Sequence, residues 1–167
     1  MVHTVLSILP THAIMSASMK ETTTRNLEET FVCASEFALS LTLQEDRGTV
    51  VALYGELGSG KTSFVQGVAK ALGVDVTIIS PTFVIERIYK LSHKNFDRMV
   101  HIDCYRIEDA SEMTLLGWDE KTKNPRNLIF VEWAERIEEI LPPHTTRVYF
   151  EFVEETIRRI KVLNPNI

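Results

Sequence analysis

The sequence TVVALYGELGSGKT at residues 49–62 joins an apolar run to a glycine-rich turn. Residues 49–54 are nearly continuously apolar, as expected for a strand that is buried on both faces of a parallel sheet. The turn that follows matches the pattern G-x-x-x-x-G-K-[ST] from Gly55 to Thr62. An amphipathic helix is expected next, because apolar residues recur at helical spacing up to Gly73. The order of strand, turn and helix predicts a phosphate-binding loop.

Each part of this loop has a physical task. Glycines let backbone N–H groups curl around phosphate oxygens, in conformations that a Cβ would obstruct. Lys61 brings a positive charge to the β- and γ-phosphates, and the Thr62 hydroxyl ligates Mg²⁺. The pattern therefore predicts that the chain binds ATP with Mg²⁺ and hydrolyses it. The expected nucleotide-binding residues are Gly55, Glu56, Leu57, Gly58, Ser59, Gly60, Lys61, Thr62 and Ser63.

Two acidic residues follow apolar runs further along the chain. Asp103 comes after Val100-His101-Ile102, and Glu132 comes after residues 128–131. A P-loop needs a second group to hold the metal ion, and an open α/β sheet binds its ligand at the carboxyl ends of the strands. The expected metal site is therefore Thr62, Asp103 and Glu132. The alternative for each acid is a solvated cap at the end of its strand.

The segment Ser80-Pro81-Thr82-Phe83 is a stiff turn that carries two hydroxyls, since Pro81 biases Ser80 toward extended backbone. One hypothesis is a nucleotide-sensing switch with Thr82 near the γ-phosphate. The alternative, which spacing alone favours, is that the hydroxyls cap the backbone before a strand. Trp133, similarly, is either functional or a cover for the edge of the sheet.

Further helices and strands complete the predicted pattern. A helix is predicted to begin at Asn26, which is followed by acidic residues in the first turn. Strands are predicted at 84–89, 99–102 and 128–132. A short capped helix is predicted at 109–117.

The last third of the chain predicts a loop, a helix and a hairpin. Residues 119–127 are polar and predict a loop, and two prolines end a helix predicted at 134–141. Residues 147–152 and 157–163 alternate in polarity, which predicts an antiparallel hairpin. Together these patterns predict an α/β P-loop NTPase fold with three layers. Its central sheet is expected to be mostly parallel, with the antiparallel C-terminal hairpin at one edge.

Composition argues against three features: a broad nucleic-acid surface, a disulfide framework and a zinc site. Its 18 basic and 23 acidic side chains give a formal net charge of −5. This balance disfavours a broad nucleic-acid surface, although a local basic patch can coexist with an acidic whole. The two cysteines lie far apart in no C-x-x-C pattern, so neither a disulfide framework nor a zinc site is indicated.

The start of the chain is apolar at Val5 to Leu9, but Pro10 follows and no Lys or Arg precedes it. A secretory signal has a basic start and a longer apolar stretch, and no run approaches the roughly 18 apolar residues of a membrane span. We therefore expect a cytoplasmic protein. Residues 1–24 are expected to form a flexible extension, and residues 25–167 a single P-loop ATPase domain.

Four segments in this order resemble the TsaE family, also called YjeE: GELGSGKT at 55–62, SPTF at 80–83, HIDCYR at 101–106 and VEW at 131–133. The resemblance covers residues 25–163. These are bacterial P-loop ATPases required for N6-threonylcarbamoyladenosine at position 37 of tRNA. The resemblance implies that Lys61, Asp103, Glu132 and Thr82 are catalytic and that Trp133 contacts the nucleotide. It also implies that residues 26–30 lie near the adenine.

The resemblance further implies partners, namely a threonylcarbamoyl-transferase subunit and its non-catalytic paralogue, of the TsaD and TsaB type. ATP hydrolysis would reset that complex between rounds, and tRNA would be met only through it. This chain departs from the family pattern at Cys104, where an apolar residue is usual. The alternatives are a small-molecule P-loop kinase, although no Arg-rich lid is evident, and a nucleotide-sensing module with negligible turnover. Arg87 and Arg106 are the candidate arginine fingers.

Overall fold

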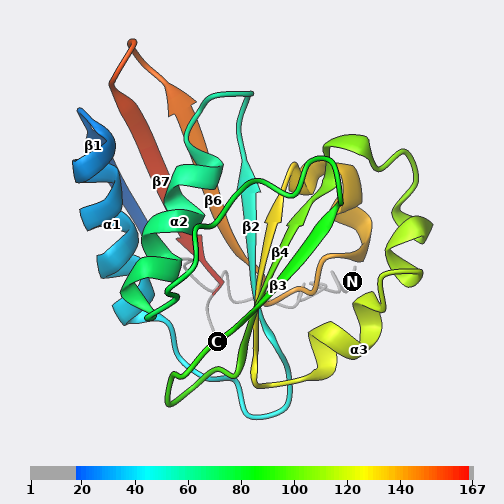
Figure 1. Ribbon diagram of the computed structural model, residues 1–167. Coiled ribbons are helices and arrows are strands. Elements are labelled where there is room, and N and C mark those ends of the chain that lie inside the picture. Colours follow the sequence, from blue (N-terminus) through cyan, green and yellow to red (C-terminus); the bar gives the residue numbers. More distant parts are fainter. Residues whose placement is uncertain (1–17, 166–167) are drawn as a thin grey trace, which may run out of the picture.

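A computed structural model describes residues 18–165, which form a seven-stranded sheet with helices on both faces (Figure 1). The helices and strands are β1 (Ser18–Thr24), α1 (Leu27–Ser40), β2 (Thr49–Tyr54), α2 (Lys61–Ala71), β3 (Glu86–Lys90), β4 (Arg98–Asp103), α3 (Trp118–Lys123), β5 (Asn127–Glu132), β6 (Thr146–Phe152) and β7 (Arg158–Asn164). The 3₁₀ helices are η1 (Cys104–Arg106), η2 (Ala110–Thr114) and η3 (Ala134–Ile140). No helix within residues 18–165 is long and apolar enough to cross a membrane.

The sheet is parallel in its centre and antiparallel at both edges. Its strand order is β1-β7-β6-β2-β5-β4-β3, with parallel pairing of β6 with β2, β2 with β5 and β5 with β4. The predicted α/β class, central parallel strands and β6–β7 hairpin are confirmed. The hairpin does not end the sheet, however, because β1 pairs with β7 beyond it, and β3 is antiparallel to β4 at the opposite edge.

The predicted extension therefore ends earlier than residue 24. Ser18 to Thr24 pair in register with Asn164 to Arg158 of β7. Three consecutive threonines at 22–24 have high strand propensity, and their pairing covers backbone groups of β7 that an open edge would expose. The Thr24 hydroxyl, which is buried, also lies 3.0 Å from that of Thr30 in α1. Residues 1–17 lie outside the described part of the chain.

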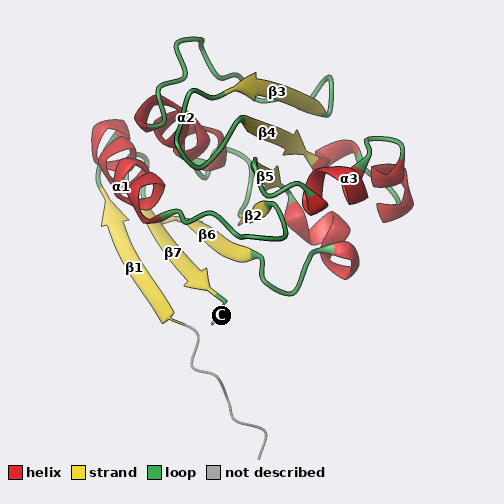
Figure 2. Ribbon diagram, turned by 90° about the horizontal axis from the view of Figure 1, so that it is seen from below, coloured by secondary structure: helices red, strands yellow, loops and turns green. Residues whose placement is uncertain are grey.

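Strand alternation divides the core into two layers, one on each face of the sheet, and Figure 2 shows α1 and α2 together on one side of the sheet. Val51 and Leu53 of β2 face α1 and α2, where the rings of Phe37 and Phe64 lie 5.3 Å apart. Val50 and Ala52 face the opposite layer, which η2, α3 and η3 cover. Gly67 permits the close approach of α1 and α2, because a Cβ there would lie 2.6 Å from the Ala34 Cβ.

Several local predictions differ from the structure. A loop was predicted at 119–127, but residues 118–123 form α3. This helix is stabilised by the buried Trp118 side chain, and it has acidic residues in its first turn and lysines in its last turn. Residues 134–140 form a 3₁₀ helix that is interrupted at Ile137. Strand β3 begins at Glu86 rather than 84, since the N–H groups of Val84 and Ile85 both donate to the Pro81 carbonyl in a turn.

Two predicted helix starts are confirmed. Asn26 caps α1, with its side-chain oxygen accepting from the Glu29 N–H at 2.8 Å. Asp109 and Glu112 form the predicted capping box, although the helix that they open, η2, is a short 3₁₀ turn. These caps depend on residues that are close in the sequence, which is why the pattern was readable there.

Candidate nucleotide-binding site

The glycine-rich turn connects β2 to α2 at the carboxyl edge of the parallel strands. Gly55, Gly58 and Gly60 have φ angles of 142°, 75° and 104°, which side chains other than glycine rarely adopt. A Cβ on Gly55 would lie 2.6 Å from the Phe150 carbonyl oxygen. Helix α2 begins directly at Lys61 without a side-chain cap. Its first N–H groups and its positive dipole end are therefore available to an anion.

Lys61 is folded back onto its own loop and is only 4% exposed. Its Nζ donates to the carbonyls of Gly55 at 2.5 Å and Glu56 at 2.9 Å. The same ammonium lies 4.2 Å from the ring centroid of Trp133. Burial lowers the pKa of Lys61, while the nearby Glu132 carboxylate acts in the opposite direction. This arrangement places a buried, hydrogen-bonded ammonium at the centre of the loop.

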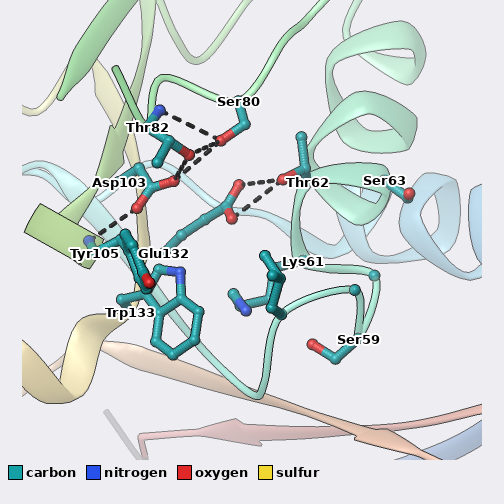
Figure 3. A pocket seen from close by; sticks show the side chains of 13 residues that line it. Ser59, Lys61, Thr62, Ser63, Ser80, Thr82, Asp103, Tyr105, Glu132 and Trp133 are labelled. Atoms are coloured by element: carbon teal, nitrogen blue, oxygen red, sulfur yellow. Dashed lines mark hydrogen bonds between the residues drawn. The ribbon is translucent and has the colours of Figure 1, made fainter. Parts of the chain in front are cut away.

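Glu132 meets the start of α2 from the end of β5 (Figure 3). The Thr62 hydroxyl lies 2.9 Å from Oε1 and 3.1 Å from Oε2 of this carboxylate. His101 Nε2 lies 2.8 Å from Oε1. Glu132 is 3% exposed, so these hydrogen bonds provide much of the polar environment of a buried carboxylate.

Asp103 lies beside Glu132 on the adjacent parallel strand, since the two residues are register partners. Its Oδ2 accepts from the Ser80 hydroxyl at 3.0 Å and from Thr82 Oγ1, and its Oδ1 accepts from the Tyr105 N–H at 2.9 Å (Figure 3). The SPTF segment is thus held against an acid of the candidate metal site. The sequence predicted Ser80 only as a hydroxyl-bearing residue of the SPTF turn. Its hydrogen bond to Asp103 was not predicted.

One pocket brings these groups together. Its lining consists of Leu57, Gly58, Ser59, Gly60, Lys61, Thr62, Ser63, Ser80, Thr82, Asp103, Tyr105, Glu132 and Trp133. Most of the residues predicted from the motif are in this list. Gly55 and Glu56 are not, and they contribute the carbonyls that hold Lys61 instead.

The donors in the pocket fit a magnesium–nucleotide complex. No group of three or more His, Cys, Asp or Glu side chains that could hold a metal ion occurs within residues 18–165. The available donors are two carboxylates, Asp103 and Glu132, and the Thr62 hydroxyl. Mg²⁺ prefers oxygen ligands and usually takes one or two carboxylates, with waters and substrate phosphates completing its shell. A site of this kind therefore suits Mg²⁺ that arrives with phosphate.

A second hollow adjoins the phosphate loop on its other side. It is lined by Asn26, Leu27, Thr30, Gly58, Gly60, Ser63, Glu155, Thr156 and Arg158. Asn26 and Leu27 thus lie next to the loop. Arg158 of β7 was not predicted. Its Nη2 lies 3.2 Å from the Gly58 carbonyl oxygen, and its guanidinium lies 4.4 Å from the ring centroid of Phe152. In the sequence Arg158 is one polar residue of a strand that alternates in polarity, and nothing local indicates its contact with Gly58.

The two predicted arginine-finger candidates do not line the main pocket. The guanidinium of Arg106 lies 5.0 Å from the ring centroid of exposed Phe83. Arg87 is on β3, opposite His101 in the register. Among the described residues that line the main pocket there is no arginine.

A glycine-rich loop between a buried strand and a helix, with acids at the ends of the neighbouring parallel strands, defines the class of P-loop α/β proteins. Within this class the chain belongs to the TsaE family. The family model described as "Threonylcarbamoyl adenosine biosynthesis protein TsaE" matches residues 24–160. The resemblance stated from four short motifs is thereby confirmed.

Relatives and a solved structure agree with this assignment. A Rickettsia felis protein is 37% identical over 139 residues, which cover 83% of this chain and 76% of the relative. A Bacillus subtilis protein is 38% identical over 113 residues, which cover 68% of each. Both are named "tRNA threonylcarbamoyladenosine biosynthesis protein TsaE". A crystal structure of Bacillus subtilis YdiB has a TM-score of 0.72 and 28% identity, covering 90% of this chain and 88% of that one.

Proposed function

We propose that this protein is a Mg²⁺-dependent ATPase needed to form N6-threonylcarbamoyladenosine at position 37 of tRNA. Its hydrolysis of ATP drives turnover of the threonylcarbamoyl-transferase complex. The observation that carries the proposal is the convergence of Lys61, Thr62, Asp103 and Glu132 in one pocket at the phosphate loop. Family membership supplies the tRNA modification in which this chemistry is used.

The side chains divide the work at the site. Lys61 exchanges the carbonyls of Gly55 and Glu56 for the β- and γ-phosphates, a stronger pairing because both partners are charged. Thr62, Asp103 and Glu132 would hold Mg²⁺, which when bound neutralises charge on the phosphates. Thr82, hydrogen-bonded to Asp103, is the proposed sensor of the γ-phosphate.

Hydrolysis by the isolated chain is proposed to be slow. The described lining of the pocket contains no arginine that would stabilise charge in phosphoryl transfer. We therefore assign acceleration to partners of the TsaD and TsaB type, with tRNA met through that complex in the cytoplasm. The same observation favours, as a second candidate, a nucleotide-sensing module with negligible turnover.

Reconstitution tests this proposal. The protein is combined with the transferase subunit, its paralogue, tRNA and ATP, and threonylcarbamoyladenosine is counted per transferase molecule. The expected result is several turnovers with the intact chain and about one without it. If omitting the chain leaves multiple turnover unchanged, the proposed role is wrong. If modification needs the chain while ATP consumption does not rise with product, the sensing module is favoured.

A further inference from the structure

The buried carboxylate of Glu132 has a partner that the phosphate-loop motif does not predict, the imidazole of His101. Alternation along β4 and β5 places His101 and Glu132 on the face of the sheet that carries the core under α1 and α2, beside Met99 and Phe130. His101 is 0% exposed, and its Nε2 lies 2.8 Å from Glu132 Oε1. Its Nδ1 has no hydrogen-bond partner among the described residues. The polar contact of this ring is therefore directed at Glu132.

Burying a histidine at this position is unfavourable for folding, so the contact with Glu132 suggests a role in function. Burying a ring nitrogen without a partner is unfavourable, and an apolar side chain of similar size would avoid that loss. The neighbours on the same face, Met99 and Phe130, are fully buried and apolar, so the core itself does not call for an imidazole.

The hydrogen bonds to Glu132 are unequal at its two oxygens. Oε1 accepts from both His101 and Thr62, whereas Oε2 is contacted by Thr62 alone, at 3.1 Å. Thr62 is also a proposed ligand of Mg²⁺, so its hydroxyl has to serve the metal and the carboxylate together. His101 is not among the proposed ligands of Mg²⁺, so its contact with Glu132 has no such double role.

From these contacts we propose that His101 is a positioning residue of the magnesium–nucleotide site. Its Nε2–H holds Oε1 and leaves Oε2, which Thr62 also contacts, as the oxygen that would serve the metal. This inference rests on the proposed function, because it assumes that Glu132 serves a bound magnesium–nucleotide complex. A donor that hydrogen-bonds a ligating carboxylate orients it, and loss of such a donor lowers metal affinity by about 10–100-fold.

Two amide replacements of His101 differ in whether their nitrogen reaches Glu132. A glutamine amide nitrogen is as many bonds from the backbone as His Nε2 and can donate to Oε1 in the same way. An asparagine amide ends one bond earlier, at the level of Nδ1, and does not reach Glu132. The pair His101→Gln and His101→Asn thus separates the Nε2 contact from the general effect of a polar group in the core.

The test measures Mg²⁺ dependence of nucleotide binding rather than turnover. The full chain is titrated with Mg²⁺ in the presence of a fluorescent ADP analogue, and binding of the analogue is also measured in EDTA. His101→Phe and His101→Asn should raise the half-saturating Mg²⁺ concentration by about tenfold or more, with little change in EDTA. His101→Gln should restore most of the parent response. His93→Phe, on a half-buried loop histidine stacked on Phe96, is the matched control.

Superimposable Mg²⁺ titrations for His101→Phe and the parent would overturn the inference, as would equal behaviour of the Gln and Asn variants. If His101→Phe does not fold, as judged by thermal unfolding, the comparison of Gln with Asn decides by itself. A parent chain whose nucleotide binding ignores Mg²⁺ would overturn the proposed function together with this inference. A parent that depends on Mg²⁺ and a His101→Phe variant that depends on it equally would overturn this inference alone.

Discussion

Lys61 is held within its own loop, so the proposed binding of a nucleotide would be an exchange of partners. The ammonium gives up the carbonyls of Gly55 and Glu56 and a position over the Trp133 ring. Phosphate would offset this loss because its oxygens carry a full negative charge, whereas the carbonyl oxygens that Lys61 leaves are neutral dipoles. The motif alone predicted the charge of Lys61, while its starting contacts depend on the loop and on β5.

Replacing Lys61 with Ala should weaken ATP binding in the presence of Mg²⁺ by roughly 10–100-fold, as expected for loss of hydrogen bonds to a charged group. Isothermal titration calorimetry measures this directly. Lys70→Ala is the control, because Lys70 is exposed near the end of the same helix. Equal ATP affinities for Lys61→Ala and Lys70→Ala would exclude the phosphate loop as the site.

Other residues of the site could not be inferred from spacing. Ser80 and Asp103 are 23 residues apart, and His101 and Glu132 are 31 apart, yet each pair is hydrogen-bonded. Arg158 reaches Gly58 across 100 residues. Such contacts arise from strand register and from the turn before β3, which local sequence patterns do not encode.

At the scale of elements, helix α2 connects the phosphate loop to the core. Its first residue is Lys61, and Gly67 in its middle lies against Phe31 and Ala34 of α1. The helix was predicted from its apolar periodicity. The need for glycine at 67 was not, because it depends on how closely α1 approaches.

Gly67→Ala tests this helix contact. An alanine normally favours a helix by about 1 kcal/mol over glycine, but its Cβ here would lie 2.6 Å from the Ala34 Cβ. Overpacking of about 1–3 kcal/mol less this helix gain of about 1 kcal/mol leaves an expected net destabilisation of up to about 2 kcal/mol, measured by urea unfolding. Gly67→Ala should cost less in an Ala34→Gly background than in the parent, because the nearest atom that the new Cβ would meet is removed. A Gly67→Ala chain that is more stable than the parent would contradict this account.

The 81–85 turn shows how one element constrains another. Ile85 has a φ of 66°, a left-handed conformation that is unfavourable for a β-branched residue. Its carbonyl accepts from the Asp103 N–H at 2.9 Å. The end of β4 thus holds the turn that carries Thr82.

At the scale of the molecule, the sheet is completed by the segment that was expected to be an extension. β1 covers β7, and β7 carries Arg158, which contacts the phosphate loop. The N-terminal strand therefore supports the hairpin that approaches the nucleotide site from the side opposite β4.

A chain that begins at Arg25 should be less stable than one that begins at Ser18. Removal of β1 exposes the backbone donors and acceptors of β7. It also leaves the Thr30 hydroxyl without its partner, the Thr24 hydroxyl. The loss of several net hydrogen bonds, at about 1 kcal/mol each, should lower the urea midpoint markedly. Equal midpoints for the two chains would show that β1 does not contribute to the fold.

Local sequence patterns were enough to predict the glycine-rich loop, the two acids that end strands, the main helices and the family. These features rest on short-range periodicity and on residue types with special backbone or charge properties, which are readable without neighbours. Tertiary structure decided what surrounds them: β1 beside β7, the Thr82–Asp103 contact, His101 against Glu132 and Arg158 against Gly58. Each of these depends on which strands lie side by side and in which register, and that follows from packing the whole sheet rather than from any local segment.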